Sequence, residues 1–262
     1  APTTTFCVPV VHDNTAYGAF ALDDNTTGTK NTSIGYNSMP NSTTGDYNTA
    51  LGSDAMVANS TGDNNTAVGE SALKSNTTAN NNTAVGYSSL LSCTTGTQNV
   101  VVGAYAADAI TTTSYNTVVG YNAMGSSAGG QENTAIGFEA MKANTTGVEQ
   151  VAVGSYALGK TTTGTRNVAV GRQALYENLS GDQNAAVGFE CMENNLVDNN
   201  SAMGYRTMLS NTTGTYNTAL GSQAMYSNTT SSYNTAIGYA ALYSADATKN
   251  TALGFNAGTS VS

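Results

Sequence analysis

The feature that most constrains this chain is a short motif, N-T-A-V-G, that returns at a fixed period. It stands at Asn65 to Gly69 and again at Asn82 to Gly86, and Asn217 to Gly221 is a further copy. Its final glycine recurs fifteen times, always 17 residues apart except for two gaps of 16. Such a short fixed period is typical of proteins built from stacked units that contact only their neighbours.

The repeat occupies nearly the whole chain. It begins at Asn14, so the sequence predicts a single solenoid domain over residues 14–262, preceded by a cap or lead-in strand over residues 1–13. Only 10% of the residues are charged, and composition of this kind alone would suit a disordered chain. A disordered chain, however, has no reason to keep an apolar residue in one register through fifteen units, whereas stacked coils must bury that residue.

The repeat has a clear internal pattern when its asparagine is numbered position 1. Position 3 is small and position 4 aliphatic, as in Ala67-Val68, and neither carries a charge. Because successive side chains of a strand point to opposite sides, this predicts a strand buried on both sides and ended by the glycine at position 5. A second small-large pair at positions 8 and 9, such as Ala72-Leu73, predicts a second short strand. Positions 10 to 17 are polar and contain an N-T-T-G turn.

These features favour β-structure over helix. A glycine in every unit, many Thr and Asn residues, and apolar pairs five residues apart do not suit a helix. We therefore predict an all-β parallel β-solenoid or β-roll of about fifteen 17-residue coils. At a strand spacing of about 4.8 Å, this gives a rod roughly 70 Å long. Asn at position 1 and Thr at position 2 are expected to form ladders from coil to coil.

The run G-x-x-N-T-A-V-G-x-x-A-L, as at Gly62 to Leu73, resembles the head repeat of trimeric autotransporter adhesins. It is also similar to the Asn/Thr/Gly repeats of bacteriophage tail fibres. The resemblance implies a left-handed parallel β-roll, a homotrimer, and an extracellular role in host attachment, as the shaft or receptor-binding segment of a fibre on a virion or a cell surface. A self-assembling structural filament subunit is the alternative.

The residues themselves also point to a partner. If the small residues of positions 3 and 8 fill the coil interior, the larger ones at positions 4 and 9 form an apolar stripe outside, which three copies could bury around one axis. The opposite arrangement, with large residues inside, permits a monomer.

The sequence shows no recognisable set of catalytic residues. The single histidine, His12, precedes the repeat, and acidic residues such as Asp46, Asp63, Asp182, Glu132 and Glu149 are scattered over turn positions without metal-ligand spacing. We therefore expect no catalytic residue, no cofactor and no metal, with a weak calcium site in the loops as the alternative.

Charge, hydropathy and cysteines exclude further classes. The net charge of −9 leaves no basic stripe for nucleic acid, and no apolar run is long enough to insert into a membrane. Cys93 and Cys191 would lie six coils apart, about 29 Å, so no disulfide is expected between them.

Tyrosines suggest a binding surface. Position 6 carries aromatic residues in many coils, and tyrosines beside Asn and Asp are common in sugar sites. Two interpretations remain open: the rings bind a host surface glycan, or they stack along the coils and shield the turns. The candidate glycan-binding residues are Tyr36, Tyr87, Tyr121, Tyr205 and Tyr239.

Two further patterns lie in the turn. Thr recurs at position 14, from Thr27 to Thr230, which resembles the threonine arrays of ice-binding β-solenoids, although Gly129, Ser180 and Val197 interrupt it. Seven turn asparagines also begin N-x-T/S sequons, which are either glycan acceptors or plain turn residues. They are Asn25, Asn59, Asn76, Asn144, Asn178, Asn211 and Asn228.

Overall fold

A computed structural model describes residues 13–244 and 247–259. In these ranges every repeat contributes one strand of three residues, and there is no helix. The strands are β1 (Thr15–Tyr17), β2 (Thr32–Ile34), β3 (Thr49–Leu51), β4 (Thr66–Val68), β5 (Thr83–Val85), β6 (Val100–Val102), β7 (Thr117–Val119), β8 (Thr134–Ile136), β9 (Val151–Val153), β10 (Val168–Val170), β11 (Ala185–Val187), β12 (Ser201–Met203), β13 (Thr218–Leu220), β14 (Thr235–Ile237) and β15 (Thr251–Leu253). The lead-in predicted over residues 1–13 lies, apart from Asp13, outside the described residues.

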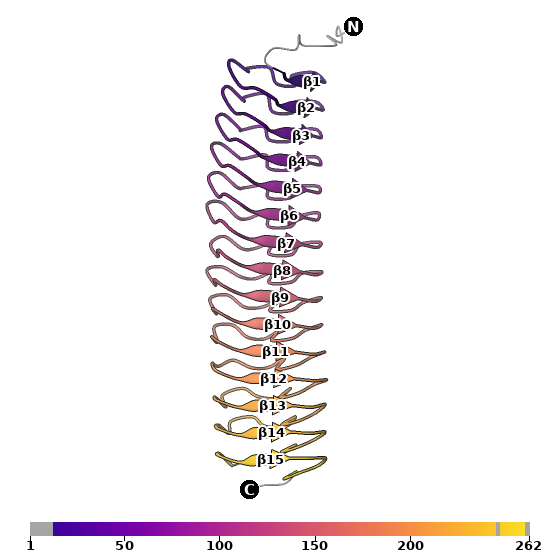
Figure 1. Cartoon of the computed structure of the whole chain (residues 1–262), viewed down its shortest axis with the longest axis vertical. Coiled ribbons are helices and arrows are strands. Elements are labelled where there is room, and N and C mark those ends of the chain that lie inside the picture. Colours follow the sequence, from indigo (N-terminus) through magenta and orange to yellow (C-terminus); the bar gives the residue numbers. More distant parts are fainter. Residues whose placement is uncertain (1–12, 245–246, 260–262) are drawn as a thin grey trace. The chain divides into compact units, whose positions relative to one another are not determined.

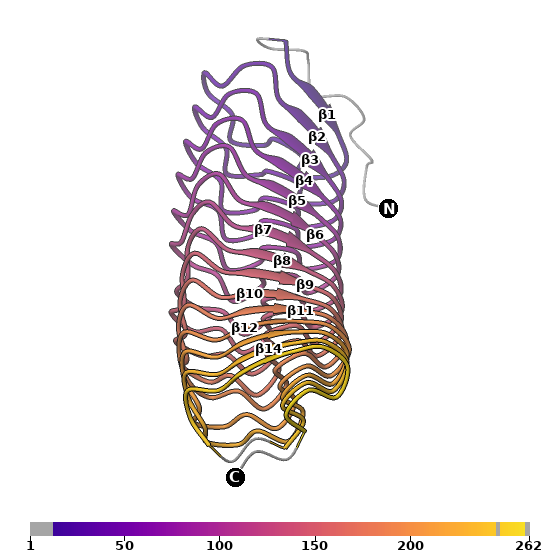
Figure 2. The ribbon, with the colours of Figure 1, turned by 60° about the horizontal axis from the view of Figure 1, so that its bottom comes forward.

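The coils belong to two compact units that divide between Gln131 and Glu132. The first holds β1–β7 and the second β8–β15 (Figure 1). Within each unit every strand pairs in parallel with the next one along the chain, and equal repeat positions stand side by side, as Ala67 does beside Ala84. In Figure 2 the coils of each unit follow one another with similar outlines. The predicted parallel β-solenoid with one coil per repeat is therefore confirmed.

The two 16-residue repeats keep this register. Ala186 pairs with Ala202, and Ala236 pairs with Ala252, although in each case one residue fewer separates the partners. The residue that these repeats lack must therefore be missing from a loop, because a loop can shorten without shifting the strand pairing.

Only one side of each strand faces the coil interior. Ala67, at position 3 of β4, is buried, whereas Thr66 and Val68 on either side of it are half-exposed. Leu51, at position 4 of β3, is 45% exposed. The prediction of a strand buried on both sides is wrong for the single chain, because a coil encloses space on one side of its sheet and leaves the other side as surface.

Positions 8 and 9 are both buried, but they do not form the predicted second strand. Ser71 and Leu73, at positions 7 and 9, have φ of 58° and 51°, and the same two positions are left-handed in the other coils. Left-handed residues turn the chain instead of extending it. The small-large pair therefore lies in a tight turn, and both of its side chains point inward.

Position 9 supplies most of the core. Its leucines and methionines are fully buried, including Met56, Leu73 and Leu158. One coil has Ala107 there instead, and the same coil has a fully buried Ile110 at position 12, where many other coils carry Asn. The larger side chain three residues later keeps the interior of this coil filled, as close packing requires.

The turn half of each coil is also stacked by backbone hydrogen bonds. The Ser71 N–H donates to the Ser53 carbonyl of the preceding coil at 2.9 Å, and the Leu73 N–H donates to the Ser89 carbonyl of the following coil at 3.0 Å. Bonds to both neighbours satisfy backbone groups that strand pairing does not reach.

The glycine at position 5 is required by geometry. Gly69 has φ of +131°, and a Cβ placed on it would lie 2.5 Å from the carbonyl oxygen of Gly86. Gly86 stands in the same relation to Gly103. Neither the backbone conformation nor the space admits a side chain.

The asparagine ladder at position 1 is confirmed. Asn82 Nδ2 donates to the Gly96 carbonyl at 2.8 Å, and Asn82 Oδ1 accepts the Asn99 N–H at 3.0 Å. The same bonds recur along both units; at Asn217, Nδ2 donates to the Ser231 carbonyl at 2.9 Å. Each amide therefore closes its own coil and joins it to the next one.

A second amide ladder at position 12 explains the sequons. Asn76 Nδ2 donates to Asn59 Oδ1 at 2.8 Å, and Asn144 Nδ2 donates to the Gly147 carbonyl at 3.0 Å. Six of the seven sequon asparagines are buried, and Asn25 is half-buried. A glycan on these buried nitrogens is incompatible with this fold.

Candidate binding surface

The apolar side chains that remain exposed gather on one face. Positions 17, 2, 4 and 6 point away from the coil interior, and we call the surface they form the outer sheet face. It carries most of the exposed large hydrophobic residues of the described chain. These are Tyr17, Tyr36, Tyr47, Leu51, Tyr87, Val100, Val102, Tyr115 and Tyr121 in the first unit, and Ile136, Phe138, Val168, Phe189, Met203, Tyr205, Tyr216, Leu220, Tyr233, Ile237, Tyr239, Leu253 and Phe255 in the second.

All five candidate glycan-binding tyrosines are exposed at position 6 of this face. Tyr36 lies after β2, and its ring meets the Phe20 ring edge to face at 5.8 Å. Tyr87 and Tyr121 lie after β5 and β7 in the first unit, and Tyr205 and Tyr239 lie after β12 and β14 in the second. Their exposure makes them available to a ligand, whereas their differing ring contacts divide them into two groups.

Rings at the same repeat position in neighbouring coils stack face to face. Phe189 and Tyr205 lie 5.7 Å apart with an interplanar angle of 18°, and Tyr239 and Phe255 lie 5.3 Å apart at 12°. The tyrosines Tyr216 and Tyr233 at position 17 do the same at 5.1 Å and 8°. For these pairs the expectation that rings stack along the coils is confirmed. Stacking also covers one face of each ring.

An aromatic residue at position 7 meets its neighbours edge to face. Tyr105 lies 5.1 Å from Tyr87 at 75° and 6.0 Å from Tyr121 at 81°. In the second unit Tyr156 meets Phe138 in the same way, at 5.3 Å and 74°. Position 7 has a left-handed backbone, with φ of 55° at Tyr105, which directs its side chain differently from position 6. Sequence reasoning missed these rings, although an aromatic residue at position 7 beside one at position 6 was the available signal.

The surroundings of Tyr105 add polar groups. Partial desolvation, followed by the effect of Tyr87, raises the pKa of the Tyr105 hydroxyl. Asp108, three residues later in the same coil, contributes to this shift as a nearby negative charge. Desolvation in turn raises the pKa of the Asp108 carboxyl. Three tyrosines from successive coils and one carboxyl group are therefore close together in the first unit.

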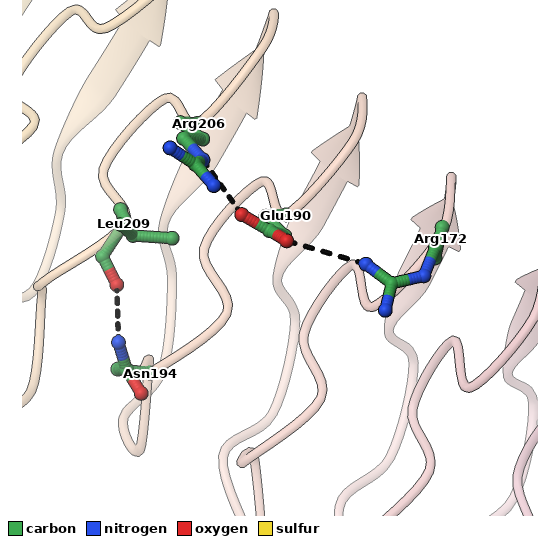
Figure 3. A network of polar contacts seen from close by, with 5 residues as sticks. All are labelled: Arg172, Glu190, Asn194, Arg206 and Leu209. Atoms are coloured by element: carbon green, nitrogen blue, oxygen red, sulfur yellow. Dashed lines mark hydrogen bonds and ion pairs between the residues drawn. The ribbon is translucent and has the colours of Figure 1, made fainter.

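A charged network occupies the corresponding part of the second unit (Figure 3). Glu190 accepts hydrogen bonds from Arg172 Nη1 at 3.3 Å and from Arg206 Nε at 2.6 Å. The two guanidinium groups also lie over aromatic rings, Arg172 over Phe189 at 5.2 Å and Arg206 over Tyr205 at 5.1 Å. The network joins three successive coils, and it leaves less of the Tyr205 ring open to a ligand.

The same coils are joined nearby by a further bond. Asn194 Nδ2 donates to the Leu209 carbonyl of the next coil at 3.0 Å (Figure 3).

Several acidic residues have a structural role that the sequence did not reveal. The Thr29 N–H donates to Asp46 Oδ1 at 2.7 Å, and the Asp46 N–H donates to Asp63 Oδ1 at 2.8 Å. Asp182 accepts the Thr165 N–H in the same way at 2.7 Å. These carboxylates at position 16 form a third ladder. Of the two glutamates at position 17, Glu149 pairs with Arg166 at 2.8 Å.

Two further features concern the acidic side chains and the threonines of the turns. The described ranges contain no group of three or more His, Cys, Asp or Glu side chains that could hold a metal ion, and His12 lies outside them. Threonine hydroxyls at position 13 donate to the next coil, as Thr77 does to the Thr94 carbonyl at 3.0 Å. The threonines at position 14 are exposed, for example Thr78 and Thr95.

Comparison with models of known protein families, with characterised proteins and with solved structures finds no match to this chain. No membrane-spanning helix is present in residues 13–244 and 247–259.

Proposed function

We propose that this chain is a non-enzymatic segment of an extracellular attachment fibre, on a virion or a cell surface, and that it acts as a homotrimer. The observation that carries the proposal is the outer sheet face, where large apolar side chains stay exposed on a backbone joined at every coil by hydrogen bonds. Contiguous exposed apolar surface of this kind marks an interaction site.

The size of the face suits an interface between copies. The interface would take the rows at positions 17, 2 and 4, and it would leave the row at position 6, at one edge of the face, open to a ligand. In the first unit these three rows are seven strands tall, roughly 30 Å by 13 Å, with a footprint of about 400 Å². The second unit carries the same rows, and the ~800 Å² that each partner contributes to a standard interface is about twice this footprint. A second copy has the same spacing between coils, so its rows of side chains would match these rows over their whole length.

Sedimentation velocity tests the assembly. We expect the wild-type chain to sediment as a trimer, and a Leu51→Glu/Val102→Glu variant to sediment as a monomer with an unchanged circular dichroism spectrum. Thr61→Glu/Thr95→Glu is the matched control, because it adds the same charge at exposed turn positions, and it should remain trimeric. A wild-type chain that is monomeric at tens of micromolar would exclude the trimer.

A self-assembling filament subunit is the alternative within the same class. It would use the same face but would join copies in an open series. Electron microscopy separates the two, since a filament lengthens with protein concentration and a closed trimer does not.

Ice binding is a second candidate, favoured by one observation. The position 14 threonines are exposed in six successive coils of the first unit, as a flat ligand lattice would require, whereas Ser180 and Val197 interrupt them in the second. The exposed threonines are Thr27, Thr44, Thr61, Thr78, Thr95 and Thr112 in the first unit, and Thr146, Thr163, Thr213 and Thr230 in the second. A gap between the melting and freezing points of a solution of the protein would support ice binding over the fibre.

A further inference from the structure

Three tyrosines of the first unit form a cluster unlike the stacked pairs. Tyr87, Tyr105 and Tyr121 come from successive coils and are 45%, 39% and 49% exposed. Their rings meet at 75° and 81°, so Tyr105 is turned across the other two. A ring turned in this way cannot be covered face to face by either neighbour.

The row that Tyr105 belongs to leaves space around it. Position 7 is Ser88 in the preceding coil and Asn122 in the following one, and neither carries a ring. The stacked tyrosines Tyr216 and Tyr233 differ, because each has a ring of the same row 5.1 Å away at an angle of 8°. No ring of its own row is therefore stacked on Tyr105.

The second unit has a comparable cluster, but it is more covered. Tyr156 lies edge to face with Phe138 and with Tyr176, at 5.3 Å and 6.1 Å, and is only half-exposed. The Lys160 ammonium group lies over the Tyr176 ring at 4.9 Å and is paired with Glu177 at 2.6 Å. A cation therefore already occupies an aromatic face there.

Charge indicates which ligand the first cluster would accept. Asp108 lies near Tyr105, and the chain carries a net charge of −9, so an anionic polymer would be repelled. A neutral pyranose has a C–H face that packs on a tyrosine ring and hydroxyls that hydrogen-bond to phenol and carboxyl groups.

We propose that Tyr105, flanked by Tyr87 and Tyr121, is a binding platform for a neutral pyranose. The proposal rests on the attachment function above and names the ligand class and the site. It moves the centre of binding from the position 6 tyrosines to a position 7 ring.

Calorimetric titration with cellohexaose, chitohexaose and a β-1,4-galactan oligomer tests the site, with polygalacturonate as the anionic comparison. We expect Tyr105→Ala to weaken binding of at least one neutral oligosaccharide about tenfold or more, equivalent to about 1.4 kcal/mol. Tyr105→Phe should stay within about threefold of wild type, because it keeps the ring. Tyr233→Ala, which removes an exposed tyrosine of a stacked pair, should bind as wild type does.

Three results would overturn the proposal in different ways. If wild type binds a neutral oligosaccharide and Tyr105→Ala binds it equally well, this site is wrong while the attachment function stands. If polygalacturonate binds more tightly than the neutral probes, the ligand class is wrong. If wild type binds none of the four, glycan attachment by this segment fails and the site fails with it. Circular dichroism of each variant checks that a loss of binding is not a loss of fold.

Discussion

The buried asparagine of each coil does more than stack. Asn82 satisfies the Gly96 carbonyl within its own coil and the Asn99 N–H of the next, and both of these backbone groups lie where no strand pairing reaches them. An unsatisfied buried polar group costs about 1–3 kcal/mol. One side chain thus determines how two coils close and how they join.

Replacing Asn82 with Ala should therefore destabilise the chain by about 2–4 kcal/mol, since two buried backbone groups lose their partners. Urea denaturation followed by circular dichroism measures the change. Thr95→Ala, at an exposed turn position of the same coil, is the control and should stay within about 0.5 kcal/mol of wild type. Equal denaturation midpoints for the two variants would show that the ladder does not stabilise the fold.

Replacing the glycine at position 5 is expected to destabilise the chain even more than replacing the asparagine at position 1. In Gly86→Ala the new Cβ would lie 2.5 Å from the Gly103 carbonyl oxygen at a backbone φ of +138°. Gly254→Ala places a Cβ at φ of +122° with no atom within 4 Å, so it shares the backbone strain without the clash. The midpoint of thermal unfolding should fall much further in Gly86→Ala than in Gly254→Ala. Similar losses would mean that backbone strain alone accounts for the glycine.

Asp108 makes stability depend on pH. Because desolvation raises the pKa of this carboxyl, the folded chain holds the proton more tightly than the unfolded chain does. This contribution is fully present below the ordinary Asp pKa of about 3.9 and is lost as pH rises through the folded pKa. Asp108→Asn should therefore gain stability relative to wild type between pH 4 and pH 8. Thermal midpoints of both proteins across this range test it, and a constant difference would contradict it.

At the level of the coil, the two apolar pairs have different roles. The pair at positions 8 and 9 fills the interior, whereas position 4 lies on the outer sheet face. The strand is only three residues long in every coil, so most of the coil is held by turn geometry and by the three side-chain ladders.

Leu73→Ala should accordingly cost about 2–5 kcal/mol, because it opens a cavity in a fully buried position. Leu51→Ala, from a position 45% exposed, should change the stability of the separate chain by less than about 1 kcal/mol and should instead weaken the proposed assembly. Denaturation below the association concentration, together with sedimentation above it, separates the two effects. An equal cost at both positions would contradict the assignment of inner and outer sides.

At the scale of the whole molecule, the described residues include one buried thiol in each compact unit. Burial raises the pKa of Cys93 to about 11 and that of Cys191 to about 12, and both side chains are fully enclosed. They belong to different units, Cys93 to the first and Cys191 to the second. Each thiol is therefore a reporter of the opening of its own unit.

In a Cys7→Ser variant, neither thiol should react measurably with a maleimide at pH 8 under native conditions, because the thiolate is scarce and inaccessible. Labelling should appear only as denaturant unfolds the unit that contains the thiol, and mass spectrometry of the digested protein identifies which one has reacted. Rapid native labelling of either cysteine would show that its unit opens far more easily than its packing indicates.

The period, the strand at positions 2 to 4, the glycine at position 5 and the asparagine ladder were all predictable from the sequence. Each depends on interactions between equal positions one repeat apart, so the period itself places the partners together. The exposed position 6 tyrosines were located for the same reason.

Three features depended on how each coil closes in space, and the sequence predicted them wrongly or missed them. A small-large pair such as Ala72-Leu73 alternates equally well in a strand and in a left-handed turn, and only the closed coil shows that both side chains point inward. The side of the strand that is interior, and hence the exposure of Leu51, follows from the same closure. The turned ring of Tyr105 is the third, because its edge-to-face contacts with Tyr87 and Tyr121 depend on how the turn after Gly103 places position 7 beside position 6 of the neighbouring coils.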